Sequence, residues 1–145
     1  IGLGLNEEEM KQNTRLNKYI IHDINKEPRL PFGDEEFDAV VCDLSIEYVT
    51  NPLELTWEIK RILKKNGIIT LSFSNRYFPP KVIKLWIDLH EFERMGYVLE
   101  LLLRTGGFKN FKTYSIRGFM RPYDDKYFGC TLLSDPLYVV YAQKS

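Results

Sequence analysis

The chain has 145 residues, and its hydrophobic fraction of 44% is enough to build the core of one domain. Lys and Arg together number 20, as do Asp and Glu, so the formal net charge of zero gives no electrostatic reason to expect nucleic acid or an anionic membrane surface as a partner. No apolar run approaches the ~20 residues that a membrane-spanning helix requires.

The first predicted elements are a strand end and a short helix. Ile1–Leu5 is typical of the last residues of a strand, so we expect further residues to precede Ile1 in the natural protein. Asn6 can cap a helix from about Glu7 to Asn13, with Glu9 at the capping-box spacing. The glutamates of the first turn have a structural role there, because the helix dipole favours carboxylates.

Two apolar runs predict strands that lie inside a parallel sheet. Tyr19–Asp23 is a short apolar run that ends in a polar pair, and Phe37–Asp43 is nearly continuous in apolar residues. A loop with Pro28, Pro31 and Gly33 separates them. Such runs are typical of parallel strands that are covered on both faces.

The next segment predicts a helix followed by a strand. Asn51-Pro52 marks a turn, and apolar residues recur with a period of 3.6 from Leu53 to Lys65. Asn66-Gly67 supplies residues that tolerate a left-handed cap, and Ile68–Ser74 is then predicted to be a strand.

A longer helical region follows. Pro79-Pro80 is predicted to open it, since proline is tolerated in a first turn, and Gly96 is predicted to divide it. The second part ends at Gly106-Gly107.

The chain closes with two strands, Phe111–Ile116 and Leu137–Ala142, joined by a long irregular connection over residues 117–136. The early alternation of strands and helices predicts right-handed crossovers and a mostly parallel sheet. The last two strands lack an intervening helix, so we expect them to pair antiparallel at one edge.

The cysteines and histidines suggest no disulfide and no metal site. Cys42 lies in an apolar strand, and Cys130 is the only other cysteine, so a reduced structural thiol and a reducing compartment, the cytoplasm, are expected. His22 and His90 are far apart and lack zinc-like spacing. Because the natural N-terminus is not visible, organellar targeting stays open.

Three segments carry a resemblance to a known family. Residues 30–40 resemble the LPF-x-D-x-x-FD-x-V stretch of class I S-adenosylmethionine-dependent methyltransferases, type 11 group. Residues 58–69 resemble their E-x-x-R-V-L-K-P-G-G helix and turn, and residues 1–10 resemble their second strand and the helix after it. Residues 2–10, 72–79 and 134–138 further resemble one uncharacterised subgroup.

The resemblance implies an α/β, Rossmann-like fold with strand order 3-2-1-4-5-7-6, in which strand seven is antiparallel. The chain starts at the family's second strand. Residues 1–145 would therefore form a single but partial domain, without the central first strand and the glycine-rich loop that it carries. The cofactor S-adenosylmethionine would lie across the carboxyl ends of the parallel strands.

The resemblance places the ribose contact at the end of the first predicted strand. Alignment puts the family's acidic ribose ligand at Gly4 or Leu5, neither of which is acidic. Backbone groups of Gly4, Leu5 and Asn6 could still reach the ribose, since glycine permits close approach. The alternative is that Gly2-x-Gly4 forms only a tight turn between strand and helix.

Other cofactor contacts follow the next two strands. The resemblance implies that Asp23 accepts from the adenine amino group and that the backbone amide of Ile24 meets the ring. The alternative for Asp23 is a local Asx turn. The stretch Asp43, Leu44 and Ser45 is expected near the methionine end of the cofactor and its sulfonium.

Candidate substrate residues follow the fourth and fifth strands of the family. Glu47 and Tyr48 are expected to line the pocket, with core packing as the alternative for Tyr48. Asn75 and Arg76 could bind a substrate carboxylate, since Arg presents a bidentate cation, and a surface role is the alternative. Residues 117–136 could form a lid or a partner surface, and a poorly ordered edge loop is the alternative.

The resemblance implies methyl transfer from S-adenosylmethionine to a small-molecule acceptor, with no metal and no nucleic-acid partner. An in-line transfer mainly requires alignment and exclusion of water, so no catalytic residue stands out. A non-catalytic binding or scaffold module is the alternative, supported by the missing ribose carboxylate. A nicotinamide-dependent oxidoreductase is disfavoured, because no G-x-G-x-x-G occurs.

Overall fold

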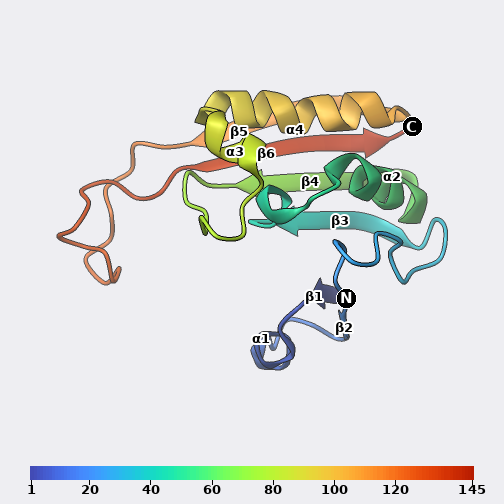
Figure 1. Cartoon of the computed structure of the whole chain (residues 1–145), viewed down its shortest axis with the longest axis horizontal. Helices are drawn as coiled ribbons and strands as arrows, with labels where there is room; N and C mark the ends of the chain where they lie inside the picture. Colours follow the sequence, from blue (N-terminus) through green and yellow to red (C-terminus); the bar gives the residue numbers. More distant parts are fainter.

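The computed structural model describes residues 1–145, which form two separate sheets (Figure 1). The smaller sheet pairs β1 (Gly2–Gly4) with β2 (Tyr19–Ile21) in parallel, and α1 (Glu7–Gln12) connects them. All three elements lie where the sequence predicts them. Asn6 caps α1, because its side-chain oxygen accepts from the backbone N–H groups of Glu8 and Glu9.

The larger sheet has the order β3-β4-β6-β5. Its strands are β3 (Phe37–Asp43), β4 (Leu63–Phe73), β5 (Phe108–Ile116) and β6 (Leu137–Lys144). β3 and β4 are parallel, whereas β6 runs antiparallel to both β4 and β5. The predicted antiparallel pairing of the last two strands at one edge is therefore confirmed, and the order matches the one implied by the resemblance.

One face of the larger sheet is covered by helices. These are the short η1 (Ile46–Tyr48), α2 (Pro52–Ile62), α3 (Lys84–Asp88) and α4 (Glu91–Thr105). The helices α2 and α4 pack side by side. The residues of β4 and β6 that point to this face are fully buried and form the centre of the core: Ile69, Leu71, Phe73, Tyr138, Val140 and Ala142.

The opposite face of β3 is open. Val41 is 71% exposed and Ala39 is also exposed, although the apolar sequence of β3 is typical of a strand that is covered on both faces. No strand pairs with the other edge of β3 or with the other edge of β1. A groove of about 620 Å³ lies between them, and most of its lining is apolar.

The helix α2 ends three residues before the predicted Lys65. Leu63 instead begins β4 and pairs with Phe37. The carbonyl groups at the end of the helix accept from the backbone N–H groups of Glu35 and Glu36, so the chain can leave the helix there without losing hydrogen bonds. Asn66 adopts the predicted left-handed conformation, with φ of 62°, but it does so within β4.

The predicted start of the next helical region at Pro79 and its division at Gly96 are wrong, whereas its predicted end is confirmed, because α4 ends at Thr105 and Gly106 caps it. Residues 79–82 form a turn, and helix α3 begins only at Lys84. Gly96 lies inside an unbroken α4 at a position with open space around it. The break falls instead at His90, whose N–H donates to the Glu93 carboxylate at 2.7 Å and caps α4.

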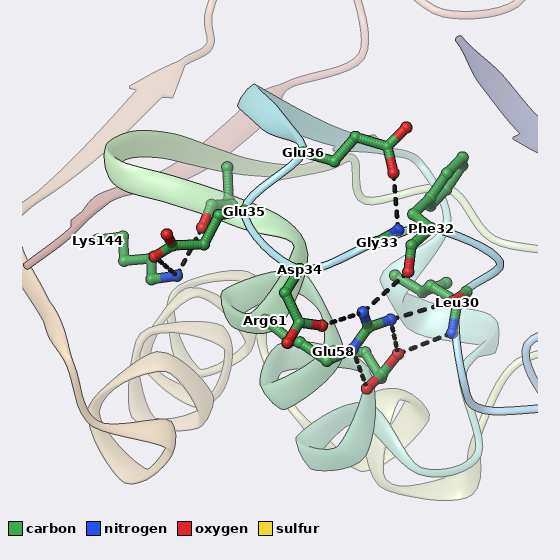
Figure 2. Close-up of polar contacts among 10 residues, drawn as sticks. Leu30, Phe32, Gly33, Asp34, Glu35, Glu36, Glu58, Arg61 and Lys144 are labelled. Atoms are coloured by element: carbon green, nitrogen blue, oxygen red, sulfur yellow. Dashed lines mark hydrogen bonds and ion pairs between the residues drawn. The ribbon is translucent and has the colours of Figure 1, made fainter.

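Two of the segments that carry the family resemblance are bound to each other (Figure 2). The guanidinium of Arg61 makes a bidentate pair with Glu58, with distances of 2.9 and 2.7 Å. It also donates to the carbonyl groups of Leu30 and Phe32, and to the carboxylate of Asp34. All five N–H donors of Arg61 are therefore used, and they hold the loop before β3 against α2.

The same loop is closed on its other side by further polar contacts (Figure 2). Gly33 N–H donates to the Glu36 carboxylate at 2.7 Å. Lys144, near the end of β6, donates to Leu63 O at 2.6 Å and to Glu35 at 3.2 Å. These contacts fix the start of β3, and so they fix where its carboxyl end lies.

Candidate functional site

Segments that follow β2 and β3 lie next to each other. The Asn25 side chain donates to Tyr48 O at 2.9 Å and accepts from Thr50 N–H at 2.9 Å. Because Asn25 comes shortly after β2 and Tyr48 shortly after β3, these bonds place the carboxyl ends of the two strands on the same side of the molecule. The predicted cofactor residues all lie at such strand ends.

Asp23 forms the local turn that we expected as its alternative role. Its Oδ1 accepts from Asn25 N–H at 3.1 Å, and its Oδ2 lies 3.5 Å from Lys26 Nζ. The side chain is 28% exposed. The Asx turn orients the carboxylate at the strand end, so one oxygen is engaged locally and the other has only a long contact with Lys26, whose side chain is 86% exposed.

The stretch after β1 has clear structural roles. A Cβ at Gly4 would lie 2.1 Å from Met10 Cε, so a glycine lets α1 pack closely on β1. Asn6 uses its side-chain oxygen for the helix cap, and Leu5 is 68% exposed. Within the chain, Gly4 O accepts from His22 N–H at 3.0 Å and Asn6 O accepts from Met10 N–H at 3.1 Å.

The stretch after β3 has an unusual backbone. Leu44 has a φ of 48°, in the left-handed region that a residue other than glycine rarely adopts. Its N–H donates to Ser72 O at 2.9 Å, and Ser45 Oγ donates to Asp43 O at 2.7 Å. The Asp43 carboxylate accepts from the Ser72 hydroxyl. These bonds hold a sharp turn at the carboxyl end of β3.

A cavity of about 710 Å³ begins beside this turn. It brings together Tyr48, Asn75 and Arg76, the three predicted substrate residues, although they come from two loops. The Tyr48 hydroxyl accepts from Phe78 N–H at 3.0 Å, and this bond ties the two loops to each other. The remaining lining residues come from the same loops, from the connection between β5 and β6, and from the first residue of β6: Leu44, Glu47, Ser74, Tyr77, Phe78, Pro79, Tyr127, Asp135, Pro136 and Leu137.

The connection over residues 117–136 forms one wall of this cavity. Arg76 Nε lies 3.0 Å from the Asp135 carboxylate, and the guanidinium lies 4.1 Å from the centre of the Tyr127 ring. Asp135 also accepts from Arg121, whose side chain is 3% exposed. Arg76 therefore already has a carboxylate partner from within the chain.

Glu47 lies at the same cavity and is buried, with 2% of its surface exposed. One of its carboxylate oxygens, Oε2, has no hydrogen-bond partner. Burial raises the pKa of Glu47, the nearby Asp43 raises it further, and Arg94 lowers it. A sequence pattern can place a residue after β3, but it does not show that this carboxylate is enclosed, because the enclosing residues come from distant loops.

Two further observations concern the chemistry of the chain. Cys42 and Cys130 are free, and burial raises the pKa of the Cys42 thiol to about 12. His, Cys, Asp and Glu side chains form no group of three or more that could hold a metal ion. None of the helices is both long and apolar enough to cross a lipid bilayer.

Comparison with known proteins relates this chain to methyltransferases. Residues 2–71 match a family described as methyltransferase domain. An uncharacterised protein of Methanocaldococcus jannaschii is 32% identical over 120 residues, which cover 77% of this chain and 57% of that protein. A malonyl-[acyl-carrier protein] O-methyltransferase of Marinomonas sp. is 31% identical over 67 residues, covering 46% of this chain and 25% of that enzyme. The chain thus spans 57% and 25% of these two relatives.

Solved structures agree in fold. An S-adenosylmethionine-dependent methyltransferase from Thermotoga maritima superposes with a TM-score of 0.65 at 20% identity, covering 100% of this chain and 73% of that one. A second, from Archaeoglobus fulgidus, gives a TM-score of 0.63 at 15% identity, covering 99% of this chain and 75% of that one. At these identities the similarities concern the fold alone.

Proposed function

Because the chain belongs to the class I S-adenosylmethionine-dependent methyltransferases, we propose that its full-length protein transfers a methyl group from S-adenosylmethionine to a small-molecule acceptor. The observation that supports this most is the arrangement at the strand ends. Asn25 joins the segments that follow β2 and β3, so the candidate cofactor residues after these strands lie on one side of the molecule. The cavity of about 710 Å³ opens beside them, and we call it the acceptor cavity. We expect such a protein to work in the cytoplasm.

The residues present suit three parts of the cofactor, which are the adenine, the sulfonium and the ribose. Asp23 is held as a hydrogen-bond acceptor for the adenine amino group, with the backbone of Ile24 beside it. The turn of Asp43, Leu44 and Ser45 suits the sulfonium end, since a carboxylate favours a nearby positive charge. The backbone of Gly4, Leu5 and Asn6 suits the ribose. The bound cofactor would supply the electrophilic methyl group, while these residues orient it and keep the acceptor in line.

We also propose that residues outside this chain supply a strand between β1 and β3. The unpaired edges of β1 and β3 both face the 620 Å³ groove, and its lining is mainly apolar, as the core of a parallel sheet is. Buried backbone N–H and C=O groups require partners, and a strand in this position would supply them to both edges. It would also bring its following loop toward the carboxyl ends of β1 and β3.

The alternative is a non-catalytic member of the family. The observation that favours it is that Gly4 and Leu5 offer no carboxylate for the ribose hydroxyl groups. A protein that binds S-adenosylhomocysteine but transfers no methyl group to any acceptor would fit this alternative.

The cofactor site can be tested through Asp23. We expect Asp23→Ala to weaken binding of S-adenosylhomocysteine to the full-length protein by about tenfold or more, because the adenine amino group loses its acceptor. Calorimetric titration measures the change. Asp38→Ala, at the amino end of β3 and paired only with Lys64, is the matched control and should bind like the wild type.

Because Asp23→Ala also removes the Asx turn, its unfolding midpoint is measured alongside. Weaker binding at an unchanged midpoint supports the ligand role. Equal binding by Asp23→Ala and wild type would remove Asp23 from the site, and no binding by a well-folded full-length protein would remove the cofactor assignment itself.

A further inference from the structure

Glu47, which lines the acceptor cavity, has one buried carboxylate oxygen that the chain leaves without a partner. This atom is Glu47 Oε2, on a side chain that is 2% exposed. A buried polar atom without a hydrogen bond costs free energy, on the order of 1–3 kcal/mol, so a native protein rarely keeps one unless something else satisfies it. Within the chain, Arg94 is the cation that acts on Glu47, but no ion pair joins them; Arg94 donates instead to Trp86 O at 2.9 Å.

The other charges of the cavity are compensated. Arg76 pairs with Asp135 at 3.0 Å, and Asp135 also accepts from Arg121. A carboxylate brought by a ligand would therefore meet an Arg76 that is already paired, in a cavity that two carboxylates, Asp135 and Glu47, already line. The cavity thus disfavours an anionic acceptor group, and the carboxylate of Glu47 in its wall requires a hydrogen-bond donor.

The remaining walls are mainly aromatic. Tyr48 and Phe78 have ring centres 6.3 Å apart, and Tyr77 and Tyr127 also line the cavity. Such walls suit a flat or apolar molecular body. Leu44 links the cavity to the turn proposed for the sulfonium, since it belongs to both.

We infer that Glu47 accepts a hydrogen bond from the N–H or O–H group that becomes methylated, so that the acceptors of this protein are amines or alcohols with a flat apolar body, not carboxylates or phosphates. This inference rests on the proposed methyl transfer. In that step the acceptor's nitrogen or oxygen forms the bond to the methyl carbon, the carbon–sulfur bond of the sulfonium donor breaks, and its electron pair stays on sulfur as a neutral thioether. The acceptor's proton moves to the Glu47 carboxylate, and from there to water after release.

The surroundings of Glu47 agree with such a role. Asp43 of β3 and burial disfavour its charged form, and Arg94 of α4 favours it. Cys42 and Tyr48, whose pKa values are themselves raised, are the other titratable groups next to it. A protonated amine or another strong donor would supply the partner that stabilises the carboxylate, so the ligand itself would bring Glu47 into the form that accepts a proton. A protonated amine gives that proton to Glu47 first, which frees the nitrogen lone pair for the attack on the methyl carbon.

The test uses the full-length protein saturated with S-adenosylhomocysteine and three probes of equal size: benzylamine, benzyl alcohol and benzoate. We expect the amine and the alcohol to bind at residues 44–48 and 74–79 in NMR titrations, and benzoate to bind at least about tenfold more weakly. Glu47→Gln should weaken the binding of benzylamine about tenfold. Glu100 is an exposed glutamate on α4, and Glu100→Gln should leave the binding of all three probes unchanged.

A second readout does not depend on the variant. Carbon-13 labelling of glutamate carboxyl groups follows the titration of Glu47 in the wild type, and benzylamine should lower its pKa. Benzoate binding as tightly as benzylamine, or a Glu47 titration that benzylamine does not move, would overturn the inference. A failure to bind S-adenosylhomocysteine at all would instead count against the proposed function, so the two failures can be told apart.

Discussion

Replacing Arg61 by alanine is expected to destabilise the full-length protein by about 3–5 kcal/mol, the usual cost of removing one partner of an enclosed ion pair. The guanidinium satisfies Glu58, the carboxylate of Asp34 and two backbone carbonyl groups at once, and it is only 20% exposed. Its loss leaves the Glu58 carboxylate without its strongest partner and releases the loop before β3. Urea unfolding measures the difference in free energy.

A matched control separates this network from ordinary surface pairs. Lys64→Ala removes the pair with Asp38, in which the side chains are 47% and 85% exposed, and it should cost no more than about 1 kcal/mol. Arg61→Lys should recover only a small part of the loss, because one ammonium group cannot reproduce five planar donors. Equal losses for Arg61→Ala and Lys64→Ala would contradict this account of the loop.

The same network predicts a dependence on pH. Hydrogen bonds from Arg61 and from Leu30 N–H, together with the charges of Arg61 and Arg29, hold the pKa of Glu58 below its ordinary value, against the opposing effect of burial. A lowered pKa in the folded state means that the stabilisation is present above the unfolded pKa and is lost as pH falls through the folded one. The stability difference between wild type and Arg61→Ala should therefore shrink in acid.

Filling the groove between β1 and β3 is expected to slow amide hydrogen exchange at both of its edges by about a hundredfold or more. In residues 1–145 alone, β1 pairs only with β2, and β3 only with β4. A strand between them would engage the free N–H groups of both edges and cover the apolar lining. Hydrogen exchange followed by mass spectrometry, applied to the full-length protein and to residues 1–145, makes the comparison.

Strand β6 is the internal control, because it is paired on both sides within residues 1–145. Its exchange should be slow in both forms as long as both fold. A 145-residue chain that does not fold by itself, beside a stable full-length protein, would also agree with the proposal. Equal exchange at β1 and β3 in two folded forms would show that nothing fills the groove.

The presence of each strand could be predicted, but not all of the bounds: β4 begins at Leu63 and not at Ile68, and β5 begins at Phe108 and not at Phe111. Phe37–Asp43 is a strand with the predicted bounds, because its apolar run is set off by polar residues on both sides. The helix before β4 was predicted to reach Lys65 but ends at Ile62, because backbone groups of Glu35 and Glu36 take over its last carbonyl groups. That choice depends on a loop more than twenty residues earlier in the chain, which a local pattern does not contain.

In the candidate site, too, some contacts could be predicted from the sequence and others could not. Tyr48, Asn75 and Arg76 could be predicted to meet, since residues after neighbouring parallel strands lie at one edge of a sheet. The pairing of Arg76 with Asp135 could not, because Asp135 lies in an irregular connection without a repeating pattern. The enclosure of Glu47 likewise depends on three segments that only the folded chain brings together.

The most direct test of the proposed cofactor site is a crystal structure of the full-length protein with S-adenosylhomocysteine. We predict that the ligand lies across the carboxyl ends of β1, β2 and β3, with its adenine amino group on Asp23 and its sulfur beside the turn of Asp43, Leu44 and Ser45. The cavity next to Glu47 would then open toward the sulfur. A ligand bound at another surface, or with its adenine on the β3 side, would contradict the proposed site.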